Sequence, residues 1–266
     1  MRRDRIQRAC GWILAVLLAA GRSQAEDPAP KQPRAASPET ARVAAPEPAK
    51  PTPGQDPIYV PPAIYVPPEL GAPLGRLGGG GTRGTGRKAT LQILAPDHLG
   101  LTLDEGPSLY WFLAEATDTR MDFVLRDGHS VEPLLELQLP TPTTAGIHAL
   151  RLSDHGVKLA SNENYQWFVS LVPDPQQRSK DFVVGAWIRR SDSTPALRSR
   201  LAAAPSAQAP LLYAESGVWY DSLASLSAQI DANPGDATLR ARRAALLQQV
   251  GLSEVAAFDR ADGKTP

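Results

Sequence analysis

The chain has 266 residues, and its 28 lysines and arginines balance 28 aspartates and glutamates, so the formal net charge is zero. Without net positive charge there is no global basic field to gather nucleic acid or anionic lipid, and we expect no nucleic-acid partner. The length allows one or two domains. Because the N-terminal quarter is poor in core-forming residues, the composition predicts one main folded body behind it.

Residues 1–25 have the organisation of a signal peptide. Four arginines precede an apolar run at residues 11–21, and small residues end at Ala25, where a signal peptidase would cut. The alternative is a transmembrane anchor, but the run is only about half of the roughly 20 residues that span a bilayer. We therefore expect a mature protein in the periplasm or outside the cell, with no stable transmembrane segment. Because Cys10 is removed with the signal, the mature chain has no cysteine.

Residues 26–57 are rich in proline and alanine and contain no aromatic residue. Such a segment cannot bury enough apolar surface to offset the entropy of ordering it. We expect a disordered linker with polyproline II character. The functional alternative is a proline-rich ligand for a partner domain or a cell-wall spacer.

Residues 58–88 contain the phrase IYVPP twice, at 58–62 and 64–68, and then four consecutive glycines at 78–81. A Walker loop is excluded because Arg87 stands where its lysine belongs and no strand precedes the glycines. Prolines impose extended backbone on the residues before them, so we expect an extended connector that lies along an edge of the domain. The glycines could form an anion-binding nest with Arg76 and Arg83, but a flexible hinge is favoured.

Several unusual phrases follow one another in the chain: YVPP, APLGRLGGGGTRG, LAPDHLGLTLDEGPSLYWFL, YQWFVSLVPDPQQRSKDFVVGAWIRR and LLYAESGVWYDSLASL. With these phrases the chain, from roughly Tyr59 to Leu252, resembles domain-of-unknown-function family 928 of bacterial exported proteins. The resemblance implies no established activity, substrate or cofactor. The doubled YVPP phrase and the fourth glycine depart from the family pattern, and both lengthen the connector.

The part of the chain from residue 89 to 191 predicts a β-sandwich of the immunoglobulin or fibronectin-III type, because short apolar runs alternate with Asp, Gly, Asn and Pro clusters. The expected strands are 90–94, 108–113, 120–126, 134–139, 146–152, 164–173 and 182–190. Alternation places Met121, Phe123 and Leu125 on one face, with Asp122 on the other.

Residues 192–258 predict a helical hairpin that packs on the sandwich, followed by a flexible tail at 259–266. Trp219, Leu223, Leu226 and Ile230 share one helical stripe. The sequence NPGD at 233–236 ends this helix and caps the next, which closes at Gly251. The fold class is therefore mainly β with C-terminal α.

Few polar groups have the spacing of a catalytic or metal site. The four histidines lack the i, i+4 spacing of a zinc helix, and we expect no metal, no cofactor and no assigned catalytic residue. Asp97-His98 and Asp154-His155 are neighbours in sequence, which chelate poorly when they lie on a strand. An alternative is a hydrolase in which these two Asp-His pairs converge in a deep pocket.

Aromatic and basic residues supply the candidate binding site: Arg76, Arg83, Tyr110, Trp111 and Tyr220. Exposed aromatic rings can recognise a glycan or a peptide, although most of these rings are expected in the core. The sequence favours an exported, non-catalytic interaction or scaffold protein whose partner is an envelope protein or a glycan. The alternative is an envelope hydrolase that acts on polysaccharide or peptide.

Overall fold

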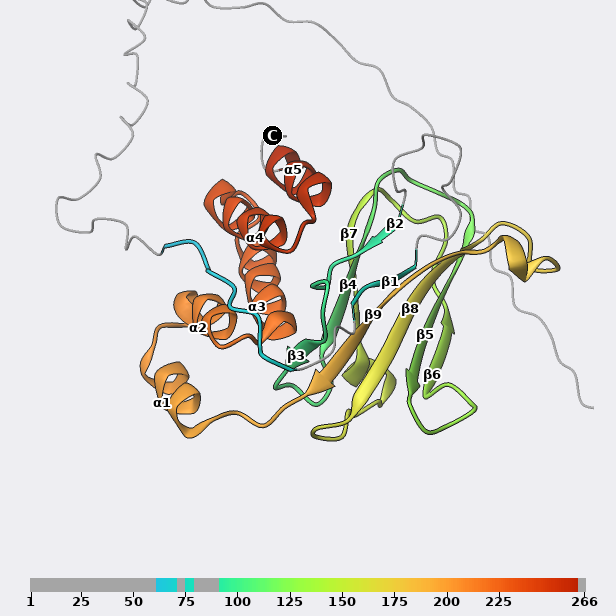
Figure 1. Cartoon of the computed structure of the whole chain (residues 1–266). Helices are drawn as coiled ribbons and strands as arrows, with labels where there is room; N and C mark the ends of the chain where they lie inside the picture. The colour runs from blue at the N-terminus through green and yellow to red at the C-terminus, as the bar shows by residue number, and fades with distance from the viewer. Residues whose placement is uncertain (1–60, 71–74, 79–90, 263–266) are drawn as a thin grey trace, which may run out of the picture. The chain divides into compact units, whose positions relative to one another are not determined.

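The computed structural model describes residues 61–70, 75–78 and 91–262 (Figure 1). The chain divides into two compact units, residues 1–53 and 54–266, and the described residues all belong to the second. The predicted signal peptide, the linker, the first tyrosine of the doubled phrase and Arg83 lie outside the described residues. Within them, no helix combines the length and the apolar character needed to cross a membrane.

Two β-sheets form the sandwich that the sequence predicts. Sheet A has the order β1-β9-β8-β5-β6, with β3 added in parallel to β9. Sheet B has the order β2-β4-β7, with antiparallel pairing. The strands of sheet A are β1 (Leu77–Gly78), β3 (Gly100–Thr102), β5 (Arg120–Asp127), β6 (Leu135–Gln138), β8 (Asn164–Val172) and β9 (Phe182–Arg190). Those of sheet B are β2 (Leu91–Ile93), β4 (Ser108–Leu113) and β7 (Gly146–Arg151).

Alternation along β5 and β8 builds the core between the sheets. Met121, Phe123 and Leu125 are completely buried, and Trp167 of β8 stacks on Phe123 with ring centroids 6.2 Å apart. Asp122 points to the other face, as predicted, yet it is also buried, because the guanidinium groups of Arg120 and Arg178 cover it at 2.8 and 2.9 Å. A buried carboxylate is tolerated when it is paired in this way.

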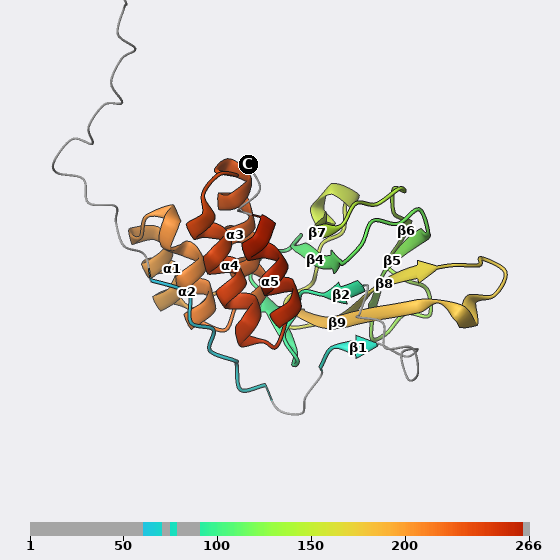
Figure 2. The same cartoon turned by 90° about the horizontal axis from the view of Figure 1, so that it is seen from above.

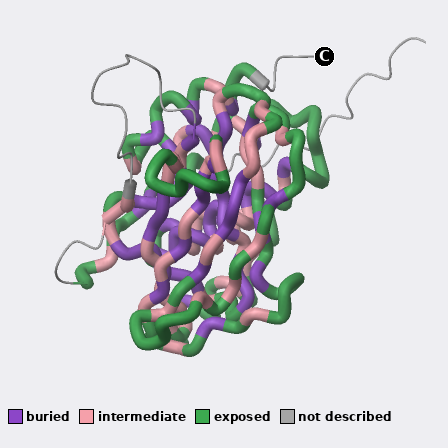
Figure 3. Tube along the Cα trace, turned by 90° about the vertical axis from the view of Figure 1, so that its right-hand side faces the viewer, coloured by how far each residue is buried: buried purple, intermediate pink, exposed green. Residues whose placement is uncertain are grey.

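The described residues contain five α-helices, which form a layer on one side of the sandwich (Figures 1 and 2). They are α1 (Pro195–Ala203), α2 (Ala209–Glu215), α3 (Trp219–Ala232), α4 (Ala237–Gln249) and α5 (Ser253–Asp262). Phe112 of β4 meets Phe258 of α5 edge to face, with centroids 5.0 Å apart. Sheet B is thus covered on one face by sheet A and on the other by helices, and buried residues gather in the middle of the trace (Figure 3).

The expected hairpin corresponds to α3 and α4. Asp236 accepts a hydrogen bond from Thr238 N as the cap of α4, and Gly251 has the left-handed φ of 78° expected at its end. Helices α1, α2 and α5 were not expected. The tail expected from residue 259 instead starts inside α5, where Asp259 is only 1% exposed because it pairs with Arg243.

Trp219→Ala should lower the free energy of unfolding by about 3–5 kcal/mol, because a fully buried ring leaves a cavity. Its Nε1 also donates to Leu94 O at 2.9 Å, so the substitution removes a bond between α3 and the sandwich. We expect one cooperative thermal transition at a lower midpoint. Circular dichroism should show the helical signal and the β-sheet signal lost together.

The matched control is Val131→Ala, which removes a side chain that is 96% exposed and should leave the midpoint unchanged. If the helices of Trp219→Ala melted separately while the midpoint of the β-sheets stayed unchanged, the helices and the sandwich would not share one core.

Candidate functional site

Strand β7 lies at the outer edge of sheet B and has a cavity on each of its two faces. In the described part of the chain, β7 pairs with β4 alone. A cavity of about 440 Å³, here called the helix-side cavity, lies toward the helices. A cavity of about 620 Å³, here called the sandwich-side cavity, opens between β7 and β6. Gly146 and Ile147 line the helix-side cavity, Leu150 and Arg151 line the sandwich-side cavity, and the two residues between them line both.

The helix-side cavity is rich in charged and hydroxyl groups. Arg243 donates to both carboxylate oxygens of Asp259, at 2.9 and 2.7 Å, and to Ser227 Oγ at 3.0 Å. Arg243 is 6% exposed and Asp259 1%, so the pair is held out of water and its geometry is fixed by the three bonds. Arg240 and Asp231 add two further charged side chains to the lining. This cavity suits polar or charged groups.

The sandwich-side cavity is mainly apolar. Its lining includes Trp111, Leu137, Leu139, Pro140, Pro142 and Leu150. His148 of β7 stacks on Trp111 with ring centroids 5.9 Å apart. Because a carbonyl oxygen only accepts, His148 Nε2 carries the hydrogen of its 2.8 Å bond to Thr144 O. This bond links the loop between β6 and β7 to β7 itself.

Two of the predicted binding residues line these cavities. Tyr110 lines the helix-side cavity and Trp111 the sandwich-side cavity, because neighbours on β4 point to opposite faces. Tyr220 instead lies in the core, where its hydroxyl accepts from Trp167 Nε1 at 3.0 Å and donates to Trp187 O at 3.1 Å. Exposures of 8%, 4% and 1% mean that these three rings do not form a solvent-facing stacking platform.

Arg76 has a structural partner. Its guanidinium donates to Val250 O at 3.1 Å, next to the end of α4, and its backbone N donates to Asp97 Oδ1 at 3.2 Å. Partial burial lowers the pKa of Arg76, and the charge of Asp97 opposes that shift. A cation at this position also complements the helix dipole. Since Arg83 lies outside the described residues, an anion nest that uses both arginines stays a prediction.

The two Asp-His pairs lie in different places. His98 contacts Tyr65, whereas Asp154 and His155 are exposed neighbours in the 3₁₀ turn Leu152–His155 and line the sandwich-side cavity together with His148. Within residues 61–70, 75–78 and 91–262, no group of three or more His, Cys, Asp or Glu side chains is arranged to hold a metal.

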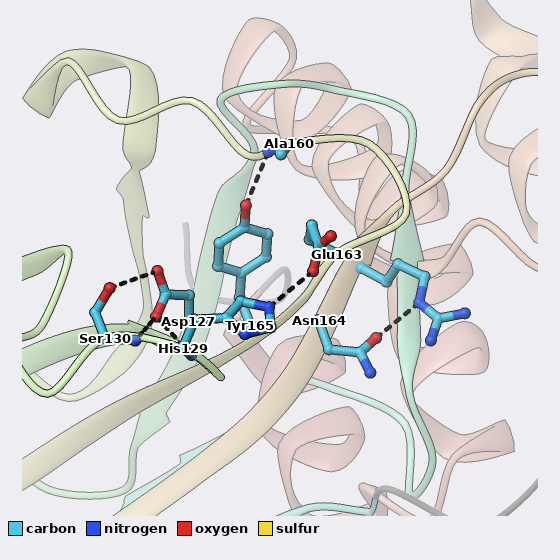
Figure 4. A network of polar contacts seen from close by, with 8 residues as sticks. Asp127, His129, Ser130, Ala160, Glu163, Asn164 and Tyr165 are labelled. Atoms are coloured by element: carbon cyan, nitrogen blue, oxygen red, sulfur yellow. Dashed lines mark hydrogen bonds and ion pairs between the residues drawn. The ribbon is translucent and has the colours of Figure 1, made fainter.

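Figure 4 shows a polar network at the end of β5 and the start of β8. Asp127 accepts from the backbone N of His129 and of Ser130, which lowers the pKa of its carboxyl group. Ser130 Oγ donates to Asp127 at 3.1 Å, while His129 Nε2 pairs with Glu163 at 3.3 Å. Because the serine and histidine have different partners, this network is not a nucleophilic triad. Its bonds instead fix the turn after β5.

No pattern in the sequence predicts the two cavities. Arg243 lies in the sequence LRARRAALL, which reads as a solvated helical face, and nothing local shows that Asp259 will meet it sixteen residues later. Only the alternation of side chains along β4 bears on the cavities, because it predicts that Tyr110 and Trp111 lie on opposite faces of the sheet.

Asp221, in the first turn of α3, lines a small cavity of about 220 Å³ and accepts from Thr102 Oγ1 at 2.7 Å and Leu103 N at 3.1 Å. Burial raises its pKa from 3.8 to about 6. The folded protein therefore binds this proton more tightly than the unfolded chain does, and the stabilisation from the protonated form is lost as the pH rises from about 4 to about 6.

Asp221→Asn should raise the free energy of unfolding at pH 7 by about 1–2 kcal/mol, because the amide oxygen still accepts both bonds and no charge is buried. Urea unfolding of both proteins at pH 4 and pH 7 measures this difference. The gain should shrink toward pH 4, and an equal gain at both pH values would contradict a raised pKa.

The fold is a β-sandwich of two sheets with an attached helical layer. The chain belongs to the family described as Domain of Unknown Function (DUF928), whose family model matches residues 78–259. No curated protein matches the chain.

Two solved structures show a limited similarity. One is a DUF3244 family protein from Bacteroides vulgatus ATCC 8482 with an immunoglobulin-like β-sandwich fold: 14% identity, TM-score 0.22, over 31% of this chain and 74% of that one. The other is an engineered protein with 10% identity and a TM-score of 0.27, over 39% of this chain and 20% of that one.

Proposed function

We propose that the protein is an exported, non-catalytic interaction protein of the cell envelope that binds an extended segment of a partner protein along β7. The observation that carries this proposal is the position of β7, an outer strand with a cavity on each face. An extended segment that pairs with such an edge places alternate side chains above and below the sheet. Each set of side chains then enters its own cavity.

The two cavities define the chemistry of the partner segment. Trp111, Leu139 and Leu150 on the sandwich side favour apolar side chains of medium size. Arg240 and Asp231 on the helix side favour polar or charged side chains. The partner segment should therefore alternate apolar with polar residues over about four to six positions, the usual length of a strand.

A protein partner is favoured over a glycan. Sugar recognition by aromatic residues needs exposed ring faces, whereas Tyr110 and Trp111 are 8% and 4% exposed. Backbone pairing along a strand edge requires no exposed ring. The edge of β7, which has no strand partner among the described residues, and the buried rings therefore agree with a peptide ligand.

The alternative is an envelope hydrolase, and one observation favours it: His148, Asp154 and His155 line the same cavity. His148 Nε2, however, is engaged by Thr144 O, and Asp154 and His155 are exposed. Loss of an envelope-hydrolysing activity in His155→Ala, with binding along β7 unchanged, would favour this alternative.

The proposed export rests on the N-terminal sequence. We expect the protein from an extracytoplasmic fraction to begin at Glu26, as measured by mass spectrometry of its N-terminal peptide. Ala25→Phe is the control, because a large residue at the cleavage position should leave the precursor uncut. Residues 1–25 retained on the isolated soluble wild-type protein would contradict a cleaved signal.

Binding along β7 is tested with a photo-crosslinking amino acid at Ala149, an exposed residue of β7 that lines both cavities. The matched control is Arg126, an exposed residue of β5 in sheet A. We expect crosslinks in the envelope from position 149 alone. A synthetic peptide that copies the crosslinked segment should protect amides of residues 146–151 from hydrogen exchange.

Ala149→Trp should weaken binding of that peptide by at least tenfold, because the larger side chain fills the helix-side cavity, while Arg126→Trp leaves binding unchanged. Equal crosslinking from both positions, or binding without protection of β7, would contradict strand addition.

A further inference from the structure

The second YVPP phrase lies beside the helical layer (Figure 1). Ala63 and Tyr65 are 4% and 7% exposed, whereas Ile64 and Val66 are 65% and 50% exposed. Alternate residues therefore face the body and the solvent, as in an extended peptide bound to a protein surface. We call this site the YVPP groove; its walls are His98, Ala214, Gly217, Trp219 and Gln249.

The groove recognises the backbone of the phrase. Gln249 Oε1 accepts from Tyr65 N at 2.9 Å, and Gln249 Nε2 donates to Ala63 O at 2.8 Å. On the other side, Val66 N donates to Ala214 O at 3.1 Å. Gly217, with φ of 73°, lets the chain come close, because a Cβ atom there would lie 3.0 Å from Val66 O. These contacts do not depend on the identity of the outward side chains.

One side chain supplies the specificity. The Tyr65 ring stacks on His98 with centroids 5.7 Å apart and meets Trp219 edge to face at 5.1 Å. His98 Nδ1 must donate to Leu99 O at 3.0 Å, so Nε2 is the acceptor for the Tyr65 hydroxyl at 3.3 Å. The groove thus recognises a tyrosine with an extended backbone on either side and prolines after it.

The chain carries this recognised phrase a second time, six residues earlier, at Ile58–Pro62. We propose that the first phrase is an alternative occupant of the YVPP groove and exchanges with the second phrase of the same molecule. Tyr59 would take the place of Tyr65, and Val60 the place of Val66. Each contact above uses the tyrosine ring or a backbone group that the first phrase also has.

Ala63 explains why the second phrase is preferred. It is nearly fully buried, and the residue six positions earlier is the bulkier Pro57. The shifted register also lengthens the connection to β1, whose entropic cost grows only slowly with length. The exchange would lengthen the chain between the groove and β1 by six residues, up to about 20 Å of extended chain, and shorten the chain before the groove by the same number of residues.

The exchange is tested by a cycle of tyrosine substitutions in the mature chain. Tyr59→Ala should leave the thermal midpoint unchanged, Tyr65→Ala should lower it by a few degrees, and the double variant should lower it at least twice as far as Tyr65→Ala. Ile64→Ala, at an outward position, is the matched control and should have no effect. Equal midpoints for Tyr65→Ala and the double variant would overturn the proposal.

Two further measurements complete the test. A synthetic AIYVPP peptide should raise the midpoint of the double variant in a saturable way, whereas AIAVPP should not; a peptide without effect would overturn recognition of the phrase. Light scattering of Tyr65→Ala at two concentrations should show a monomer. A concentration-dependent dimer would overturn exchange within one molecule, because the first phrase would then occupy the groove of a second copy.

Discussion

Burial of sheet B on both faces is the constraint on which the rest of the structure depends. Strand β4 is buried from Leu109 to Leu113, so half of its side chains need sheet A as a cover and half need the helices. A sandwich without the helical layer would expose Tyr110 and Phe112 to water. The helices therefore belong to the core of the domain, and the cavities on either side of β7 arise where the two covers end.

Polar atoms of aromatic residues fix how the layers meet. Trp219 Nε1 bonds to Leu94 O, and the Tyr220 hydroxyl links Trp167 Nε1 to Trp187 O. Apolar packing alone allows small sliding movements, whereas a buried donor that loses its acceptor costs the full desolvation of that donor. Gly100 supports the same junction, since a Cβ atom there would lie 2.6 Å from the Tyr220 ring. The position of α3 on the sandwich is thereby defined.

The fold class was predictable because its determinants are local. Period-two alternation gave β5 and β8, turn residues bounded β4 and β9, and the stripe on α3 together with Asp236 and Gly251 gave the two central helices. The strands β1 and β3, which have two and three residues, were not predicted. Helix α1 escaped prediction because its sequence, PALRSRLAA, buries only Leu197 and so has no apolar stripe.

The candidate site was less predictable, since it depends on pairings between distant segments. Nothing in the sequence of β7 shows that one of its edges stays unpaired within the described chain, and nothing near Gln249 shows that it will contact residues 63 and 65. The tyrosines could be predicted to lie on a domain edge, but the selection of Tyr65 depends on His98 and Trp219, which reach it only through the tertiary fold.

The YVPP groove also has a mechanical consequence. Among the described residues, tension that comes from the N-terminal side of residue 61 acts on Ala63 to Val66 before it acts on β1. Three hydrogen bonds to Gln249 and Ala214, with the Tyr65 ring behind them, take up that force. The short ladder of β1 on β9, only two residues long, is shielded from it. Mechanical strength at this end of the domain is thus set by a glutamine and a tyrosine in the helical layer's groove, and not by the sandwich.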